Sequence, residues 1–200
     1  MVFVMTDLVL ALLAFLLPLA WSPGPGNVFF AANGARFGLR ATLGLSAGYH
    51  LATWLVTVGL AAGLAAALAD RPAWLSGLRW GGCAYMLWLA YGFLRSGHTR
   101  AEVAPQPAGF RDGAVLLLLN PKAYVIILLM LSQFMAPFAA YGGGAMIATL
   151  FTLNNLAAFT TWTLAGDLLL RRFRDPVSGR RLNIAFGLLL AGVAVWMALP

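Results

Sequence analysis

Two prolines and two glycines, Pro23-Gly24-Pro25-Gly26, interrupt an apolar run that extends over residues 8–32. Proline lacks a backbone N–H and clashes with the preceding turn, and glycine favours bent backbone, so a helix cannot continue unbroken through this motif. In lipid, unpaired backbone groups are tolerated only where they are buried in protein or line a watery cavity. The motif therefore predicts a broken membrane helix with a candidate binding site at the break.

The composition supports a membrane protein. Hydrophobic residues make up 62% of the chain, charged residues 10%, and the mean hydropathy is +0.85, which is too apolar for a domain exposed to water. One span needs about 20 apolar residues, so the 200 residues predict six spans in a single all-α transmembrane domain. Because Met1 to Asp7 contain no Lys or Arg, we expect the first apolar stretch to be a helix rather than a signal peptide.

The apolar runs give approximate bounds for the six helices. We expect them over residues 6–36, 40–68, 73–94, 112–135, 144–170 and 181–199, with the longest loop at about 96–111.

A second interruption, Asn120-Pro121-Lys122, lies between apolar runs in the other half of the chain. Pro121 follows Pro23 by 98 residues (121 minus 23), which is close to half the chain length. Paired interruptions in two halves are typical of inverted repeats with a binding site between them. We therefore expect two inverted three-helix repeats, at about 1–95 and 112–200, with helices one and four broken. Two unrelated proline kinks are the alternative.

Arginine positions predict the orientation. Ten arginines fall in the connections at 36–40, 95–111 and 171–181, whereas the other side of the membrane holds only Arg71 and Arg79. The positive-inside rule places the ten in the cytoplasm and both termini outside. The cluster at 171–181 is also expected to contact anionic lipid headgroups, unless it is a topology signal alone.

Glycines recur four residues apart in the first half, the spacing that lets transmembrane helices approach closely. The pairs are Gly34/Gly38, Gly44/Gly48, Gly59/Gly63 and Gly77/Gly81. They predict tight packing among the first three helices. We derive no dimer interface from them, and a homodimer stays an open alternative.

Lys122 is the only lysine and is expected near the middle of the hydrocarbon layer. A charge at that depth is costly, so it should face a cavity or a partner and is a functional candidate. The alternative is a lysine that snorkels or is satisfied by nearby carbonyl groups.

Other polar residues are expected inside the membrane. For Asn154 and Asn155, amide bonds between helices and ligand contact are equal alternatives. His50 is either a packed histidine or a proton relay. The candidate substrate-binding residues are Ser22, Pro23, Gly24, Pro25, Gly26, Asn27, Asn120, Pro121, Lys122, Asn154 and Asn155.

Several function classes are disfavoured. No His-Glu-x-x-His run and no Gly-x-Ser-x-Gly motif is present, so we expect no enzyme, metal or cofactor. The single cysteine, Cys83, cannot form an internal disulfide or a thiolate metal site. The net charge of +7 resides in arginines between spans and does not indicate nucleic acid. A passive channel or pore subunit is harder to exclude, because broken helices also form selectivity filters.

Ser22-Pro23-Gly24-Pro25 with the glycines at 34, 38, 44, 48 and 59 resembles the LysE/RhtB family of amino-acid exporters. Leu119-Asn120-Pro121-Lys122-Ala123 is similar to that family's motif in helix four, and 181–187 is similar to the start of its last helix. The resemblance implies a secondary transporter of the bacterial inner membrane that exports amino acids or related metabolites in exchange for protons.

One departure from the family concerns coupling. Many members carry an acidic residue after the second glycine pair of helix two, where this chain has Tyr49-His50. The candidates for proton coupling are then Lys122, His50 or a carboxyl group nearer the interface. We expect the N–H groups of half-helices beginning near 24–27 and 122–124, together with Lys122, to hold a substrate carboxylate.

Overall fold

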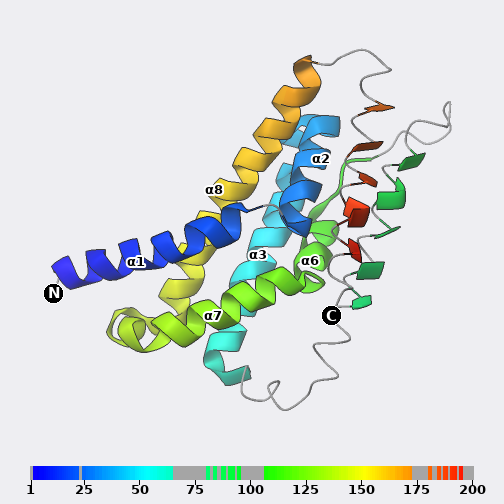
Figure 1. The fold of residues 1–200 in the computed structure, drawn as a ribbon. Coiled ribbons are helices and arrows are strands. Elements are labelled where there is room, and N and C mark those ends of the chain that lie inside the picture. Colours follow the sequence, from blue (N-terminus) through cyan, green and yellow to red (C-terminus); the bar gives the residue numbers. More distant parts are fainter. Residues whose placement is uncertain are drawn as a thin grey trace.

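The computed structural model describes residues 2–22, 24–64 and 106–172, with shorter pieces at 80–95 and 180–195. The described part is all-helical, as predicted (Figure 1). Its helices are α1 (Val2–Trp21), α2 (Pro25–Ala41), α3 (Leu43–Gly59), α6 (Phe110–Leu118), α7 (Pro121–Phe138) and α8 (Gly143–Arg172). A π-turn, Leu60–Leu64, extends α3, and a 3-10 turn, Ala139–Tyr141, extends α7.

The first predicted break is confirmed. α1 ends at Trp21 and α2 begins at Pro25, with a bend of 64° between them. Gly24 is the N-cap of α2 and Pro25 its first residue, a position where proline's missing N–H costs nothing. Pro23 lies outside the described residues. The predicted end at about residue 36 lies two residues before Gly38, where the backbone of α2 leaves the helical conformation (φ 81°, ψ 171°) and the helix kinks before it continues to Ala41.

The second predicted break is also confirmed. α6 ends at Leu118 and α7 begins at Pro121, which again occupies the first helical turn, with Asn120 as N-cap in an extended conformation (φ −96°, ψ 97°). At both breaks, therefore, one helix ends and the next helix begins with a proline.

The six-span count goes beyond what the described residues establish. Two described helices, Leu43–Gly63 and Pro121–Tyr141, are long and apolar enough to cross a membrane, and the bent pair α1–α2 makes a third if it counts as one span. The predicted helices 73–94 and 181–199 lie largely outside the described residues, although every residue described within them is helical. The inverted six-helix repeat stays a prediction.

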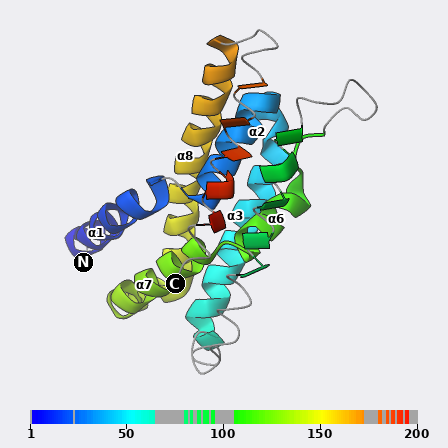
Figure 2. The same cartoon turned by 45° about the vertical axis from the view of Figure 1, so that its right-hand side comes forward.

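The helices pack mainly between the two halves of the chain. α2 runs along α8, and α3 packs against both α6 and α8, while α1 and α7 contact α8 and each other (Figures 1 and 2). Contact between α2 and α3 is slight. The predicted tight packing within the first three helices is therefore not found for α2 and α3.

Glycines create the close approaches between halves. A methyl group at Gly48 of α3 would overlap the carbonyl oxygen of Phe110, and one at Gly113 of α6 would overlap that of Leu45. The pair α2 and α8 repeats this arrangement, because Gly34 lies against Thr163 and Gly166 lies against the carbonyl of Ala31.

The remaining predicted pairs differ. A methyl group added at Gly59 or Gly63 would meet no atom within 4 Å among the described residues, and Gly77 is outside them. The four-residue spacing thus marked close packing at only some of the predicted positions.

The buried apolar residues form two cores. One is centred on Phe30, Leu45, Leu117 and Phe159 and joins α2, α3, α6 and α8. The other joins α1, α7, α8 and the π-turn.

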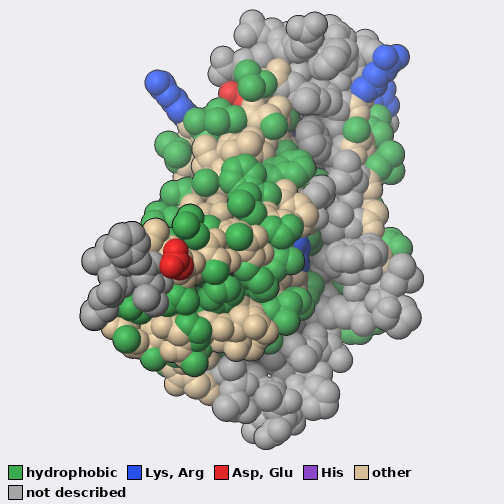
Figure 3. Space-filling model, turned by 60° about the vertical axis from the view of Figure 1, so that its left-hand side comes forward, with side chains coloured by type: hydrophobic (Ala, Val, Ile, Leu, Met, Phe, Trp, Pro, Cys, Tyr) green, Lys and Arg blue, Asp and Glu red, His purple; other side chains and the backbone are tan. Residues whose placement is uncertain are grey.

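The outer surface is apolar, as expected for a membrane protein. Figure 3 shows hydrophobic side chains covering the middle of this face, with Lys and Arg side chains projecting at its upper end. Leu10, Leu55, Val125, Leu153 and Leu168 are each more than half exposed. Such a surface is suited to contact with lipid chains rather than with water.

Candidate functional site

Lys122 connects the two broken segments. Its Nζ donates to the carbonyl oxygen of Ser22 (2.8 Å) and to Ser22 Oγ (3.0 Å). A lysine ammonium has three N–H donors, so Ser22 uses two of them. A methyl group at Gly24 would lie 2.9 Å from Nζ and 2.8 Å from Cδ of Lys122. The missing side chain at Gly24 is therefore what lets the lysine cross the break in helix one.

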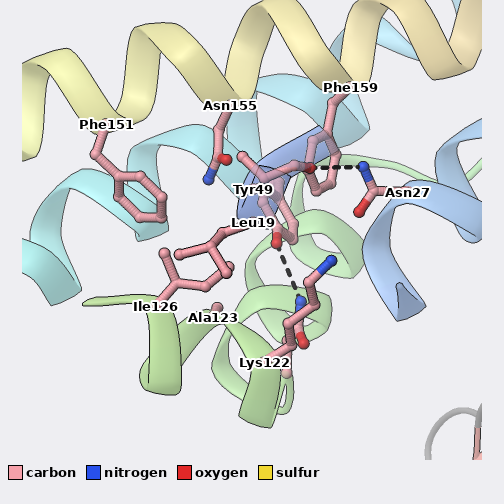
Figure 4. Close-up of a pocket in the computed structure, with 11 residues that line it drawn as sticks. Leu19, Asn27, Tyr49, Lys122, Ala123, Ile126, Phe151, Asn155 and Phe159 are labelled. Atoms are coloured by element: carbon pink, nitrogen blue, oxygen red, sulfur yellow. Dashed lines mark hydrogen bonds between the residues drawn. The ribbon is translucent and has the colours of Figure 1, made fainter. Parts of the chain in front are cut away.

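A small, half-open cavity of about 20 Å³ lies beside this junction. Such a volume holds about one water molecule. Its lining brings together α1, α2, α3, α7 and α8 (Figure 4). The lining residues are Leu19, Ala20, Asn27, Tyr49, Asn120, Lys122, Ala123, Ile126, Phe151, Asn155 and Phe159.

Four of the predicted substrate-binding residues line this cavity, namely Asn27, Asn120, Lys122 and Asn155. Others among the described candidates have structural roles that the contacts make plain. Pro25 and Pro121 start helices, and Gly26 gives room to Phe159, whose ring would lie 2.8 Å from a methyl group there.

Asn27 closes the first break. Its Nδ2 donates to the carbonyl oxygen of Ala20 at 3.0 Å, and the side chain is only 3% exposed. That carbonyl belongs to the last turn of α1, where backbone oxygens lack partners within the helix. The side-chain amide of Asn27 therefore replaces part of the hydrogen bonding that the break removes.

Asn120 occupies the corresponding place at the second break. Its Nδ2 donates to the hydroxyl oxygen of Tyr49 at 3.2 Å (Figure 4). The side chain does not cap α7, and Oδ1 is buried with no hydrogen-bond partner among the described residues.

Tyr49 was missed as a site residue by the sequence reasoning, which noted it only as the neighbour of His50. It is 2% exposed, and its ring lies 4.6 Å from that of Phe159 and 5.5 Å from that of Phe30, measured between centroids. These rings hold it in place. No sequence signal singles it out, because aromatic residues are common in apolar helices.

His50 lies next to the cavity lining but is not part of it. Its Nδ1 is 2.7 Å from the carbonyl oxygen of Ser46, which requires Nδ1 to carry the proton of that bond. Its Nε2 is buried without a partner among the described residues, and its ring packs on Phe30 and Phe159. This environment fits a packed histidine and leaves its coupling role a prediction.

The two asparagines of α8 differ in role. Asn154 Oδ1 accepts a bond from Trp21 Nε1 at 3.3 Å, so Asn154 joins α8 to the end of α1. Asn155 is 4% exposed and lines the cavity. Interhelical bonding, one of the two alternatives proposed from sequence, thus applies to Asn154, whereas ligand contact by Asn155 stays a prediction.

No group of three potential metal ligands among His, Cys, Asp and Glu occurs in the part of the chain that the structure describes. The polar atoms at the cavity are an ammonium group, amides and a phenol. Such a set binds solutes by hydrogen bonds and charge.

Comparison with known proteins identifies the family. The family model described as LysE type translocator matches residues 17–199. The cysteine/O-acetylserine efflux protein of Salmonella paratyphi A is 35% identical over 182 residues, which cover 88% of this chain and 90% of that protein. The protein of the same name from Escherichia coli K12 is 32% identical over 182 residues, which again cover 88% of this chain and 90% of that protein.

No solved structure matches this chain. The resemblance carried by the motifs at residues 22–25 and 119–123 is confirmed by the family match, which covers nearly the whole chain. Family membership assigns the chain to transport rather than to catalysis. The protein belongs to the LysE type translocator family.

Proposed function

We propose that this protein exports small amino acids or closely related metabolites across the bacterial inner membrane, with both termini outside. The curated relatives are named as efflux proteins for cysteine and O-acetylserine, which are small zwitterions. The observation that carries the proposal is the placement of Lys122 at the junction of both broken helices, beside a cavity lined with amides.

The substrate carboxylate binds at Lys122. Two N–H donors of its ammonium group hold Ser22, and the third is the donor for the carboxylate. The first turns of α2 and α7 have no side-chain cap, so their backbone N–H groups add partial positive charge on the same side. Leu19, Ile126 and Phe151, which lie across Tyr49 from Lys122 in Figure 4, receive the substrate side chain.

The size of the cavity favours a carrier over a pore. An amino acid is several times larger than the one water molecule that about 20 Å³ admits. We propose that substrate binds when the surrounding helices move apart, a movement that a carrier makes in every cycle. Proton exchange, with Lys122 or His50 as the titrating group, is the driving reaction that we propose.

Counterflow in proteoliposomes tests the carrier. Radiolabelled cysteine, serine, alanine and O-acetylserine should each be screened for uptake into vesicles loaded with the unlabelled compound. We expect at least one to show saturable uptake that internal solute accelerates, because a carrier returns faster when loaded. Uptake that rises linearly with concentration and is independent of the internal solute would contradict the carrier mechanism and indicate a passive pore.

A further inference from the structure

The amide of Asn120 is arranged unlike that of an ordinary helix cap. An asparagine at an N-cap normally accepts a hydrogen bond from the second or third backbone N–H of its own helix. Asn120 is the N-cap of α7 but makes no such bond. Its Oδ1 is instead buried without a partner among the described residues, and the residue as a whole is only 4% exposed. Burying an unpaired carbonyl oxygen is unfavourable, so this oxygen would be stabilised by a hydrogen-bond donor.

Tyr49 sets the orientation of this amide. The Tyr49 hydroxyl oxygen accepts a bond from Asn120 Nδ2, and the two polar atoms of an amide point in different directions. In the structure the nitrogen faces Tyr49, and the oxygen is turned away from it. Packing of Tyr49 between Phe30 and Phe159 keeps the phenol from following a rotation of the amide.

The unpaired oxygen belongs to a residue that lines the same cavity as the cation. Asn120 and Lys122 both line it, and only Pro121 separates them in the chain. The cavity thus combines an N–H donor with positive charge and a buried acceptor without a partner among the described residues. An α-amino acid presents the complementary pair, a carboxylate and an ammonium group on one carbon atom.

We propose that Asn120 Oδ1 accepts a hydrogen bond from the ammonium group of the substrate, and that Tyr49 is the positioning residue that keeps this oxygen available. This inference rests on the proposed function, because it assigns the second pole of the same binding site. It makes Asn120 the residue by which the protein distinguishes amino acids from carboxylates that lack the amino group.

The test measures this discrimination. Inhibition of counterflow by serine, alanine and cysteine is compared with inhibition by their analogues without the α-amino group, 3-hydroxypropionate, propionate and 3-mercaptopropionate. Sites built to bond a substrate N–H reject analogues that lack it, so the wild-type protein should prefer each amino acid strongly. In Asn120→Leu we expect this preference to fall by about tenfold or more. Asn120→Asp, which keeps an oxygen acceptor, should retain it.

Tyr49→Phe tests the positioning role. Loss of the hydroxyl frees the amide to turn, so the preference should fall by about three- to tenfold while packing is kept. Tyr124→Phe is the matched control, because it removes a hydroxyl that bonds the Leu118 carbonyl near the same break without touching Asn120. That variant should keep the wild-type preference.

The outcomes separate this inference from the proposed function. If no amino acid supports counterflow in the wild-type protein, the proposed function fails. If the wild-type protein shows counterflow but Asn120→Leu and Tyr49→Phe retain the full preference, the assignment of Asn120 is overturned and the export function stands. Melting temperatures of the purified variants in detergent identify any that misfold. Tyr49→Phe removes a single oxygen atom and introduces no charge, so it keeps the test valid if Asn120→Leu or Asn120→Asp does not fold.

Discussion

At the residue scale, Lys122 shows how a charge in the membrane is accommodated. The sequence left two possibilities, a functional cation or one satisfied by carbonyl groups. The structure combines them, because Nζ bonds the carbonyl and hydroxyl oxygens of Ser22 and still borders a cavity. The same ammonium group therefore joins the two broken helices and borders the cavity.

Replacement of Lys122 separates charge from geometry. Lys122→Met has nearly the same length but no charge, and we expect the KM for the best counterflow substrate to rise about 10- to 100-fold, the range for loss of a charged hydrogen bond. Lys122→Arg keeps the charge, so we expect it to raise the KM less than Lys122→Met does. Because arginine hardly titrates, this variant would still lose any transport step that requires Lys122 to release a proton.

The control for this pair is Arg111→Met, which removes a cation from an exposed position at the start of α6. It should leave the KM unchanged. Normal affinity and rate in Lys122→Met would mean that the lysine is structural and that backbone N–H groups alone hold the carboxylate.

At the element scale, the contacts between helix pairs depend on glycine. Where α8 crosses α2 at Gly166, backbone lies directly on backbone, so an added methyl group meets the carbonyl of Ala31 and not a movable side chain. The same holds where α3 crosses α6 at Gly48 and Gly113. Relief of such an overlap requires the helices themselves to separate.

Gly166→Ala should therefore destabilise the protein. Overpacking typically lowers the free energy of unfolding by about 1–3 kcal/mol. Because the contact at Gly166 is with backbone, which cannot move aside as a side chain can, we expect a loss at the upper end of this range. We expect a melting temperature in detergent several degrees lower. Gly59→Ala is the matched control, since it is also helical and has nothing within 4 Å of the added methyl; alanine's better helix propensity should leave it neutral or slightly stabilised. Equal stability of the two variants would refute backbone contact at Gly166.

At the scale of the whole molecule, one end of the described helices gathers the basic residues. The middle of α2 meets the segment before α6, because Asn33 Oδ1 accepts a hydrogen bond from the Ala108 N–H at 3.2 Å. A methyl group at Gly38 would lie 3.9 Å from Asp167 near the end of α8. The arginines at 36, 40, 111, 171 and 172 are thus brought to one end, as the positive-inside rule requires of a single membrane face.

Reporter fusions test this orientation. Fusions near Arg100 and Arg174 should report a cytoplasmic location, and fusions at Pro200 should report the exterior, because ten arginines oppose two across the membrane. A cytoplasmic C-terminus would require an odd number of spans and would overturn the inverted repeat as well.

The sequence by itself determined the features that depend on neighbouring residues. Proline and glycine restrict the backbone at their own positions, so both breaks were predictable to within a few residues. Apolar composition likewise settled the membrane class. The polar residues flanking the breaks, Asn27, Asn120 and Lys122, could be named as site candidates for the same local reason.

Only the tertiary structure decided which of these residues meet. Tyr49 bonds Asn120 across 71 positions, and Lys122 bonds Ser22 across 100. The glycines approach helices of the opposite half rather than their neighbours in sequence. Such contacts depend on how far each helix slides and turns against its partners, and that is set by the packing of all side chains together. A periodic pattern in one helix carries no information about the register of another.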